Sequence, residues 1–221
     1  MQLIQIQKRQ AKKEKEKAIG EVGGFSQPSK MPCYSWSIPA QLCKTGSKLA
    51  KIEGSVCHGC YALKGFYHMP STKNAMRRRY GKIKNKNFVK SFVAALQGET
   101  FFRWFDSGDL QSMGMLQNIV EIAKQTPHCK HWLPTKEVVL VSQFLKSGKS
   151  FPENLTVRVS APMINQVSHS TVTGQGSIVL TDFSMAPIGA IACNAPKQDG
   201  KCLECRACWK RDVATIAYLK H

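Results

Sequence analysis

The chain has 221 residues, of which 43% are hydrophobic, and a net charge of +18 from 32 basic and 14 acidic side chains. This size corresponds to one ordinary domain, and the hydrophobic content excludes wholesale disorder. No run of about 18 apolar residues occurs, so no membrane span is expected. The charge near the N-terminus follows a short apolar stretch, the wrong order for a secretory signal. We therefore expect a cytoplasmic protein whose clustered cysteines stay reduced.

Residues 1–24 form a basic polar segment that ends at three glycines and is expected to be a solvated tail or a frayed helix. The remaining residues, 25–221, are expected to form a single α/β domain with a cysteine-rich segment at 193–209. The patterns predict strands at 34–38, 100–105, 131–133, 155–159, 177–180 and 188–192. They predict helices at 88–96, 116–123 and 138–145, and a final amphipathic helix at 213–219.

About six strands separated by helices indicate a parallel sheet, either open or closed into part of a barrel. We expect a partial (β/α)6 barrel of mainly parallel strands. In such folds the chemistry gathers at the carboxyl ends of the strands. The polar residues at these positions are Asp106, Ser107, Asp109, Thr135, Lys136, Glu137 and Ser160.

Four of the nine cysteines lie near the C-terminus, at Cys193, Cys202, Cys205 and Cys208. A thiolate at every third position lets a turning backbone aim several sulfurs at one point. Zinc sites built from cysteine usually separate two C-x2-C pairs by a longer loop, whereas three successive cysteines at this spacing are typical of a [4Fe–4S] cluster. The spacing therefore favours a cluster, with zinc or free thiols as alternatives.

A second group, Cys43-x13-Cys57-x2-Cys60, has three sulfurs, a number that leaves one iron of a cubane open. Cys33 lies near enough in sequence to be a fourth ligand, and the three cysteines could also be core thiols. His58, between Cys57 and Cys60, is expected to be a loop residue.

Cys129 stands apart between two histidines, His128 and His131. This cluster could bind a metal, although a buried thiol beside surface imidazoles is the more common arrangement.

Residues 73–90 carry eight basic side chains and no acidic one. We expect a helix followed by a loop here, either as a solvated basic face or as a contact for the phosphates of nucleic acid. No base-reading motif accompanies the run.

Several motifs in one order resemble a phage-encoded family known as gene product 88. They are Ser37-Ile-Pro-Ala40, Cys43, Cys57-x2-Cys60-Tyr61-Ala62-x2-Gly65, Arg103-Trp-x-Asp106-Ser-Gly-Asp109, Trp132-Leu-Pro-Thr-Lys-Glu137, Asn154-Leu-x-Val-Arg158-x-Ser160 and Cys193-x8-Cys202-x2-Cys205-Arg206-x-Cys208-Trp209. The resemblance spans roughly residues 34–221, implies a location in the host cytoplasm during infection, and supplies no activity.

The order of segments is also similar to the core of radical S-adenosylmethionine (SAM) enzymes. That resemblance implies a cluster on three cysteines after the first strand and a turn after the second strand that holds the amino group of SAM. The turn would be Ser107-Gly108-Asp109, and Glu137, Arg158 and Ser160 would complete the cofactor site. This chain departs from the usual C-x3-C-x2-C pattern, because thirteen residues separate its first two cysteines.

Three hypotheses for the function follow. The first is a radical-SAM-like enzyme of unknown substrate, with a second, auxiliary cluster on the C-terminal cysteines. The second is a non-enzymatic cluster or zinc protein that binds nucleic acid or a host complex through its basic surface. The third, an electron-transfer module, is weaker because a small carrier does not need a full α/β barrel.

Overall fold

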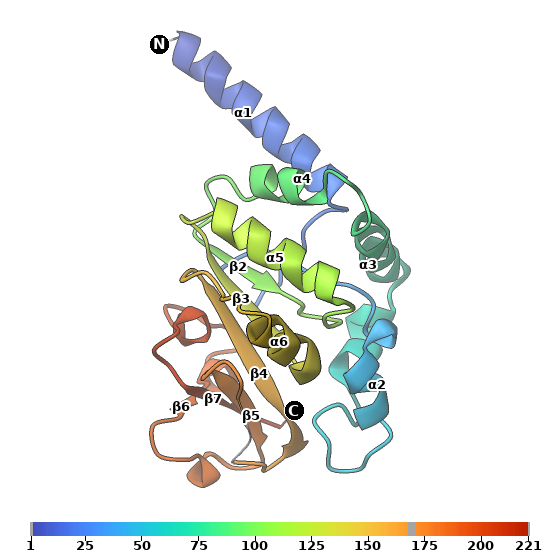
Figure 1. Ribbon diagram of the computed structural model, residues 1–221, viewed down its shortest axis with the longest axis vertical. Helices are drawn as coiled ribbons and strands as arrows, with labels where there is room; N and C mark the ends of the chain where they lie inside the picture. Colours follow the sequence, from blue (N-terminus) through green and yellow to red (C-terminus); the bar gives the residue numbers. More distant parts are fainter. Residues whose placement is uncertain (1, 168–170, 221) are drawn as a thin grey trace.

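A computed structural model describes residues 2–167 and 171–220 as an α/β protein (Figure 1). In this described part, seven strands form one sheet in which every pair is parallel. The strands are β1 (Ser35–Trp36), β2 (Phe101–Trp104), β3 (Lys130–Thr135), β4 (Leu155–Ile164), β5 (Gly176–Leu180), β6 (Ile191–Ala192) and β7 (Thr215–Leu219). Their order in the sheet is β1-β2-β3-β4-β5-β7-β6, which confirms the predicted parallel α/β class.

Six α-helices are described: α1 (Gln2–Glu21), α2 (Lys44–Leu49), α3 (Pro70–Lys82), α4 (Phe88–Ala95), α5 (Met113–Gln125) and α6 (Val138–Lys146). The apolar stripes of α4, α5 and α6 pack with one face of β1 to β4, and together they form the main core. Phe92, for example, stacks on Trp104 with ring centroids 4.7 Å apart. The helices at 88–96, 116–123 and 138–145 are therefore confirmed. None of the described helices is long and apolar enough to cross a bilayer.

The opposite face of the sheet is unusually polar, because the alternate residues Arg103, Trp132, Thr156, Arg158 and Ser160 point to it. The cysteine-rich segment crosses this face between β6 and β7. Its short helix η6 (Ala207–Trp209) inserts the Trp209 side chain, whose ring lies 5.3 Å from that of Trp132.

The N-terminal segment is a helix over nearly its whole length, and its first part projects from the body of the molecule (Figure 1). Only the end near Glu21 is fixed to the domain. Lys15 forms an ion pair of 2.5 Å with Glu99, and Ser91 donates to a carboxylate oxygen of Glu21 at 2.6 Å. The basic residues before Lys15 are exposed.

The predicted final helix at 213–219 is wrong, because this segment forms strand β7. The strand lies between β5 and β6, where both of its faces are covered, Ala217 by one apolar cluster and Ile216 by another. A two-sided burial of this kind produces a short apolar run that cannot be distinguished from a helix by periodicity. The β-branched residues Thr215 and Ile216 favour the strand.

Strand β4 also runs further than expected, through Pro162 to Ile164. Its pairing with β5 shifts register between Ser160 and Ile164, so the missing N–H of the proline interrupts no regular ladder. The sheet has seven strands, whereas the sequence predicts about six, because its pattern assigns β7 to a helix.

Candidate functional site

The loop after β1 brings the three upstream cysteines together. Cys43 immediately precedes helix α2, and the thirteen residues between Cys43 and Cys57 are held by hydrogen bonds to β4. Val56 donates its backbone N–H to Pro162 O at 2.9 Å, and Gly54 O accepts from Ile164 at 2.9 Å. The loop is therefore paired with the extended end of β4, and this pairing returns the chain to Cys57.

The three sulfurs of this trio are neighbours. A β-carbon on Gly46 would stand 3.6 Å from the sulfur of Cys57 and 3.7 Å from that of Cys43. Cys43, Cys57 and Cys60 are also close enough that a charge on one raises the pKa of another. Burial, the largest cause, and neighbouring negative charges raise the pKa of Cys43 to about 12. A raised pKa favours the protonated, weakly nucleophilic form of this thiol.

The turn after β2 lies beside the trio. Gly108 has a φ of 82°, and a β-carbon there would clash with Ile38 Cγ1 and stand 2.7 Å from Ile38 O. Ile38 in turn donates its N–H to Ser107 O at 3.2 Å. Gly108 thus lets the turns after β1 and β2 touch, which fixes the predicted cofactor-binding turn against the cysteine loop.

Asp109 holds the ends of β2 and β3 together. One carboxylate oxygen accepts from Thr135 Oγ1 at 2.6 Å and from Leu110 N at 2.7 Å, and the other accepts from Lys136 N at 2.8 Å. Burial raises the pKa of this carboxyl to about 6, although the three hydrogen bonds lower it. A charge on Asp109 also raises the pKa of Cys43, so the predicted site residue lies beside the trio.

Glu137, another predicted site residue, is buried and positions the cysteine loop. Its Oε1 accepts the backbone N–H of Thr45 at 2.9 Å, in the first turn of α2 directly after Cys43. Ser107 has a different character. Its hydroxyl is one of three buried side-chain polar atoms that have no hydrogen-bond partner among the described residues. Such an atom beside a candidate site is available to a ligand.

Asp106 connects three segments, a role that its place in a strand-end motif does not reveal. Ser35 Oγ donates to its Oδ1 at 2.5 Å, and Ser37 Oγ donates to the same atom. Tyr67 donates to Oδ2 at 3.0 Å, and the Tyr61 hydroxyl donates to the Asp106 carbonyl at 2.6 Å. The segment after Cys60 is therefore tied to the ends of β1 and β2.

The C-terminal cysteines gather on the polar face of the sheet. Cys193 follows β6, and its N–H donates to Ala217 O at 2.8 Å. The Cys208 sulfur lies 3.2 Å from the Tyr218 hydroxyl. A charge on Cys193 or Cys205 raises the pKa of Cys202, and one on Cys193 raises that of Cys208, so the four residues are close together.

Arg158 fixes the backbone of this cysteine segment and has no donor left for a ligand. It is fully buried, at 0% exposure. Its five N–H groups donate to the carbonyl oxygens of Ala207, Cys208, Lys210, Val213 and Gly176, at 2.7 to 3.3 Å. Ser160, which is also predicted to complete the cofactor site, accepts a 3.0 Å hydrogen bond from Ser177. Arg158 therefore supports the C-terminal cysteine segment, whereas Ser160 contacts strand β5.

Cys33 belongs with the C-terminal group. Charges on Arg103 and Cys202 act on its thiol, and the Cys202 N–H donates to Lys30 O at 2.9 Å. The alternative that Cys33 supplies a fourth ligand to the trio therefore finds no support in its position.

The side chains of His128, Cys129 and His131 have different surroundings. The Cys129 side chain is buried in the main core. His128 Nε2 lies 3.1 Å from Leu96 O, whereas His131 is buried between Trp104 and Thr126. These three side chains thus meet different partners and do not form a metal site.

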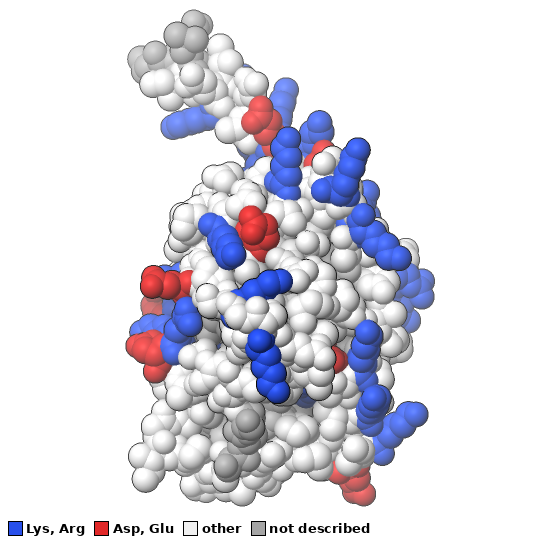
Figure 2. Space-filling model, viewed as in Figure 1, with Lys and Arg blue, Asp and Glu red and all other residues white. Residues whose placement is uncertain are grey.

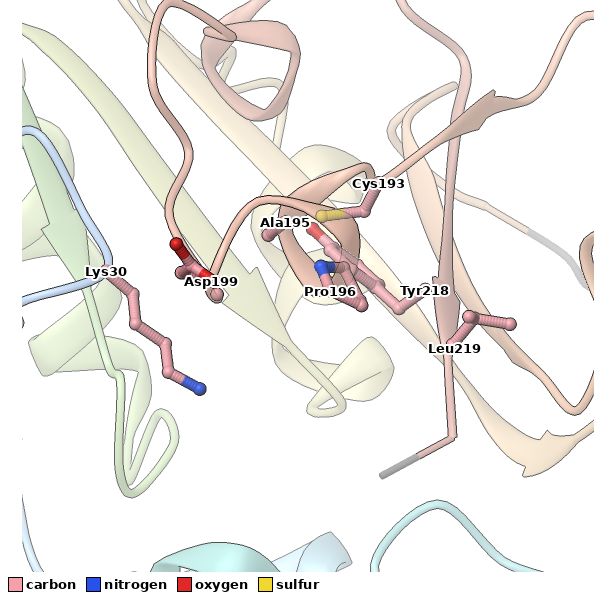
Figure 3. A pocket seen from close by; sticks show the side chains of 8 residues that line it. Lys30, Cys193, Ala195, Pro196, Asp199, Tyr218 and Leu219 are labelled. Carbon is pink, nitrogen blue, oxygen red and sulfur yellow. The ribbon is translucent and has the colours of Figure 1, made fainter.

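A pocket of about 400 Å³ opens beside the C-terminal cysteines (Figure 3). Cys193, Asp199 and Tyr218 line it, together with Lys30 from another segment. The pocket therefore gives solvent and small molecules access to Cys193, whereas Cys208 is not among its lining residues.

The arrangement as it stands is not a closed metal site. In residues 2–167 and 171–220, no three histidine, cysteine, aspartate or glutamate side chains converge closely enough to hold a metal ion. The donor chemistry nevertheless suits a metal, because seven cysteines form two groups and six of these thiols are partly buried. Burial, the main cause, raises the pKa values of Cys57, Cys193 and Cys202 as well as that of Cys43, so metal-free nucleophilic catalysis by these groups is disfavoured.

These features define an all-parallel α/β protein with two cysteine groups on the same sheet. The chain belongs to the gene product 88 family, whose family model matches residues 3–211. No curated protein and no solved structure matched the chain.

Proposed function

We propose that the protein is an iron–sulfur protein with a radical-SAM-like active site at the upstream trio. The observation that carries this proposal is the meeting of Cys43 and Cys57 with the Ser107–Asp109 turn at the ends of the first two strands. Strands β1 to β5 follow one another in the sheet in chain order, and helices α4 to α6 cover one face. Both features support our proposal that the fold is a partial barrel.

Three features of the upstream trio favour an iron–sulfur cluster there. The donor set consists of three thiols, which is the number that leaves one iron open. Gly46 leaves the space between two of the sulfurs free of a side chain. The buried Ser107 hydroxyl is without a partner among the described residues, beside the position where a cofactor would lie. Closing the trio around a cluster requires side-chain rotations, because the sulfurs do not converge as they stand.

A [4Fe–4S] cluster with SAM on its open iron supplies one-electron reduction and a radical. Cys43, Cys57 and Cys60 would hold the cluster. Ser107 and Asp109 would bind the amino group of SAM, because Asp109 has three of its roughly four acceptor positions occupied and retains one.

Glu137 acts as a positioning residue, since it fixes the first turn of α2 and hence the direction of Cys43. The contacts of Arg158 and Ser160 favour a structural role in place of the predicted contact with the cofactor. Cys193, Cys202, Cys205 and Cys208 would hold an auxiliary cluster, with four ligands and no open position.

The experiment is an electron paramagnetic resonance measurement on the reduced protein, purified without oxygen, with and without SAM. We expect the spectrum to shift when SAM is added. The shift should disappear in the variant Ser107→Ala with Asp109→Asn, and it should persist in the matched control Cys33→Ser, whose thiol lies with the other group. A spectrum of the wild-type protein that is indifferent to SAM overturns the enzyme proposal.

A non-enzymatic role is the second candidate, and the supports of the C-terminal cysteines favour it. Arg158 and Thr156 fix the backbone of the segment by hydrogen bonds to carbonyl groups, as expected for a structural zinc or cluster site. Such a site would attach β7 and the cysteine-rich segment to the sheet. Zinc without iron or sulfide in the purified protein would favour this candidate.

A further inference from the structure

A flank of the molecule beside the trio combines exposed aromatic rings with a segment that lacks acidic residues. No aspartate or glutamate occurs between Glu53 and Glu99. The same stretch contains the eight basic residues of 73–90 and, in addition, Lys64. Figure 2 shows Lys and Arg side chains along the edge of the molecule on which α3 lies in Figure 1. This field attracts a polyanion.

Part of the basic run serves the fold. Arg79 is buried and donates to Gly24 O at 2.9 Å, and Arg78 donates to Gly23 O at 3.1 Å, so both hold the turn after α1 against α3. Arg77, Lys84 and Lys86 remain exposed. The cations on the surface are therefore fewer than the run indicates, and they lie along α3 and the loop after it.

The aromatic rings lie at the other end of α3. Two short helices, η2 (Tyr61–Leu63) and η3 (Gly65–His68), connect Cys60 to α3. Phe66 is 79% exposed, far more than a ring of this size in a core. Tyr61 is 55% exposed, and its hydroxyl donates to Asp106 O, so this ring is held in place while much of it remains exposed.

We propose that single-stranded nucleic acid binds along this aromatic–basic flank, which we define by Tyr61, Lys64, Phe66, Arg77, Lys84 and Lys86. Bases stack on the exposed rings, and the phosphates contact the cations, as in proteins that bind single strands without strong sequence preference. Helix α3 has 13 residues and is about 20 Å long, a span that several nucleotides cover.

The flank favours a single strand over a duplex, because unpaired bases can use the face of Phe66 whereas paired bases are stacked on one another. Tyr61 directly follows Cys60, so a base on its ring lies next to the trio. If the proposed enzymatic function holds, nucleic acid is then its substrate class. The binding itself does not depend on a cluster.

The test is fluorescence anisotropy of the full chain with a labelled 20-nucleotide oligo-dT and with a 20-base-pair duplex at several salt concentrations. We expect the single strand to bind more tightly. Phe66→Ala should weaken its binding roughly tenfold. The control Val139→Ala, which shortens an apolar side chain on α6 that is 66% exposed, should leave binding unchanged.

A charge reversal tests the binding of the phosphates. The double variant Arg77→Glu with Lys84→Glu should reduce the slope of log affinity against log salt by about 0.7 for each phosphate that is no longer neutralised. Lys146→Glu on α6 is the control. Absence of binding at low salt, an equal or greater affinity for the duplex, or a Phe66→Ala variant that binds like the wild type overturns the proposal. These experiments measure the binding of nucleic acid alone. A negative result is therefore distinguishable from the absence of an iron–sulfur cluster.

Discussion

Individual residues decide whether the turns after β1 and β2 can meet. The contact between Gly108 and Ile38 leaves no space for a side chain, and the positive φ of Gly108 disfavours any other residue. Glu137 and Asp109 then attach the cysteine loop and the ends of two strands by hydrogen bonds to backbone N–H groups. The candidate site therefore rests on a few close contacts between segments that are distant in sequence.

Replacing Gly108 by alanine should lower the free energy of unfolding by about 3 kcal/mol or more, because strain in the backbone adds to a clash with Ile38. Chemical denaturation measures the effect. The matched control is Gly148→Ala, since Gly148 has a similar φ of 76° but nothing within 4 Å of its missing β-carbon. The control should cost only about 1 kcal/mol. Equal losses in the two variants would show that the close approach to Ile38 is unimportant.

His131 predicts a dependence of stability on pH. Its Nδ1 accepts from Trp104 Nε1 at 3.3 Å, and its Nε2 lies 2.8 Å from Thr126 Oγ1, a pattern that suits the neutral ring. Burial, followed by the charge of His128, lowers its pKa to about 3. Below pH 6.5 the His131 ring therefore binds a proton in the unfolded chain but stays neutral in the folded protein. The free energy of unfolding falls for this reason as the pH decreases from 6.5 toward 3.

The limiting slope from this group is about 1.4 kcal/mol per pH unit. The variant His131→Phe removes this titration. The unfolding free energy of the wild type minus that of the variant should therefore decrease as the pH falls. Denaturation curves between about pH 7 and pH 4.5 provide this difference. A difference that stays constant with pH would contradict the buried, neutral state of His131.

At the scale of elements, the sequence predicts the helices that have a single apolar face and fails at the C-terminal strand. Helices α4, α5 and α6 show clear stripes, and the predicted ranges agree with them within a few residues. Strand β7 is covered on both sides, and its pattern wrongly predicts a helix. The contacts of Arg158 with the cysteine segment connect residues about 50 positions apart, so no local pattern could indicate them.

Arg158 is predicted to hold the C-terminal cysteine segment. Arg158→Met removes five hydrogen bonds to carbonyl groups, three of them buried, and should lower the free energy of unfolding on the order of 3 kcal/mol or more. It should also speed the alkylation of Cys208 by iodoacetamide, measured by mass spectrometry under native conditions. The control Arg211→Met removes one long, exposed hydrogen bond and should change neither quantity noticeably. Unchanged alkylation of Cys208 in Arg158→Met would refute this role.

At the scale of the whole molecule, the sequence predicts the parallel α/β class and the two cysteine groups, and the family match covers nearly the entire chain. It could not predict how the thirteen residues between Cys43 and Cys57 fold. The structure pairs that loop with the end of β4, which returns Cys57 to Cys43. A longer spacing than in the radical SAM pattern is therefore compatible with neighbouring sulfurs.

Arg103 of β2 lies near residues that belong to the surroundings of both cysteine groups. Burial lowers the pKa of its guanidinium group, whereas charges on Tyr61 and Asp106, and on Tyr218 and Cys208, raise it. The group also lies over the ring of Trp132, 4.6 Å from its centroid. The surroundings of the upstream trio and of the C-terminal group therefore adjoin at Arg103.

We propose that both groups bind iron–sulfur clusters, and the amounts of iron, sulfide and zinc per chain decide whether they do. After purification without oxygen, we expect about eight irons and eight sulfides per wild-type chain and little zinc. The triple variant Cys43→Ser, Cys57→Ser, Cys60→Ser should retain about half of the iron and sulfide, because the C-terminal cluster remains. Zinc without sulfide in the wild type, or iron that is unchanged in the triple variant, would contradict the account.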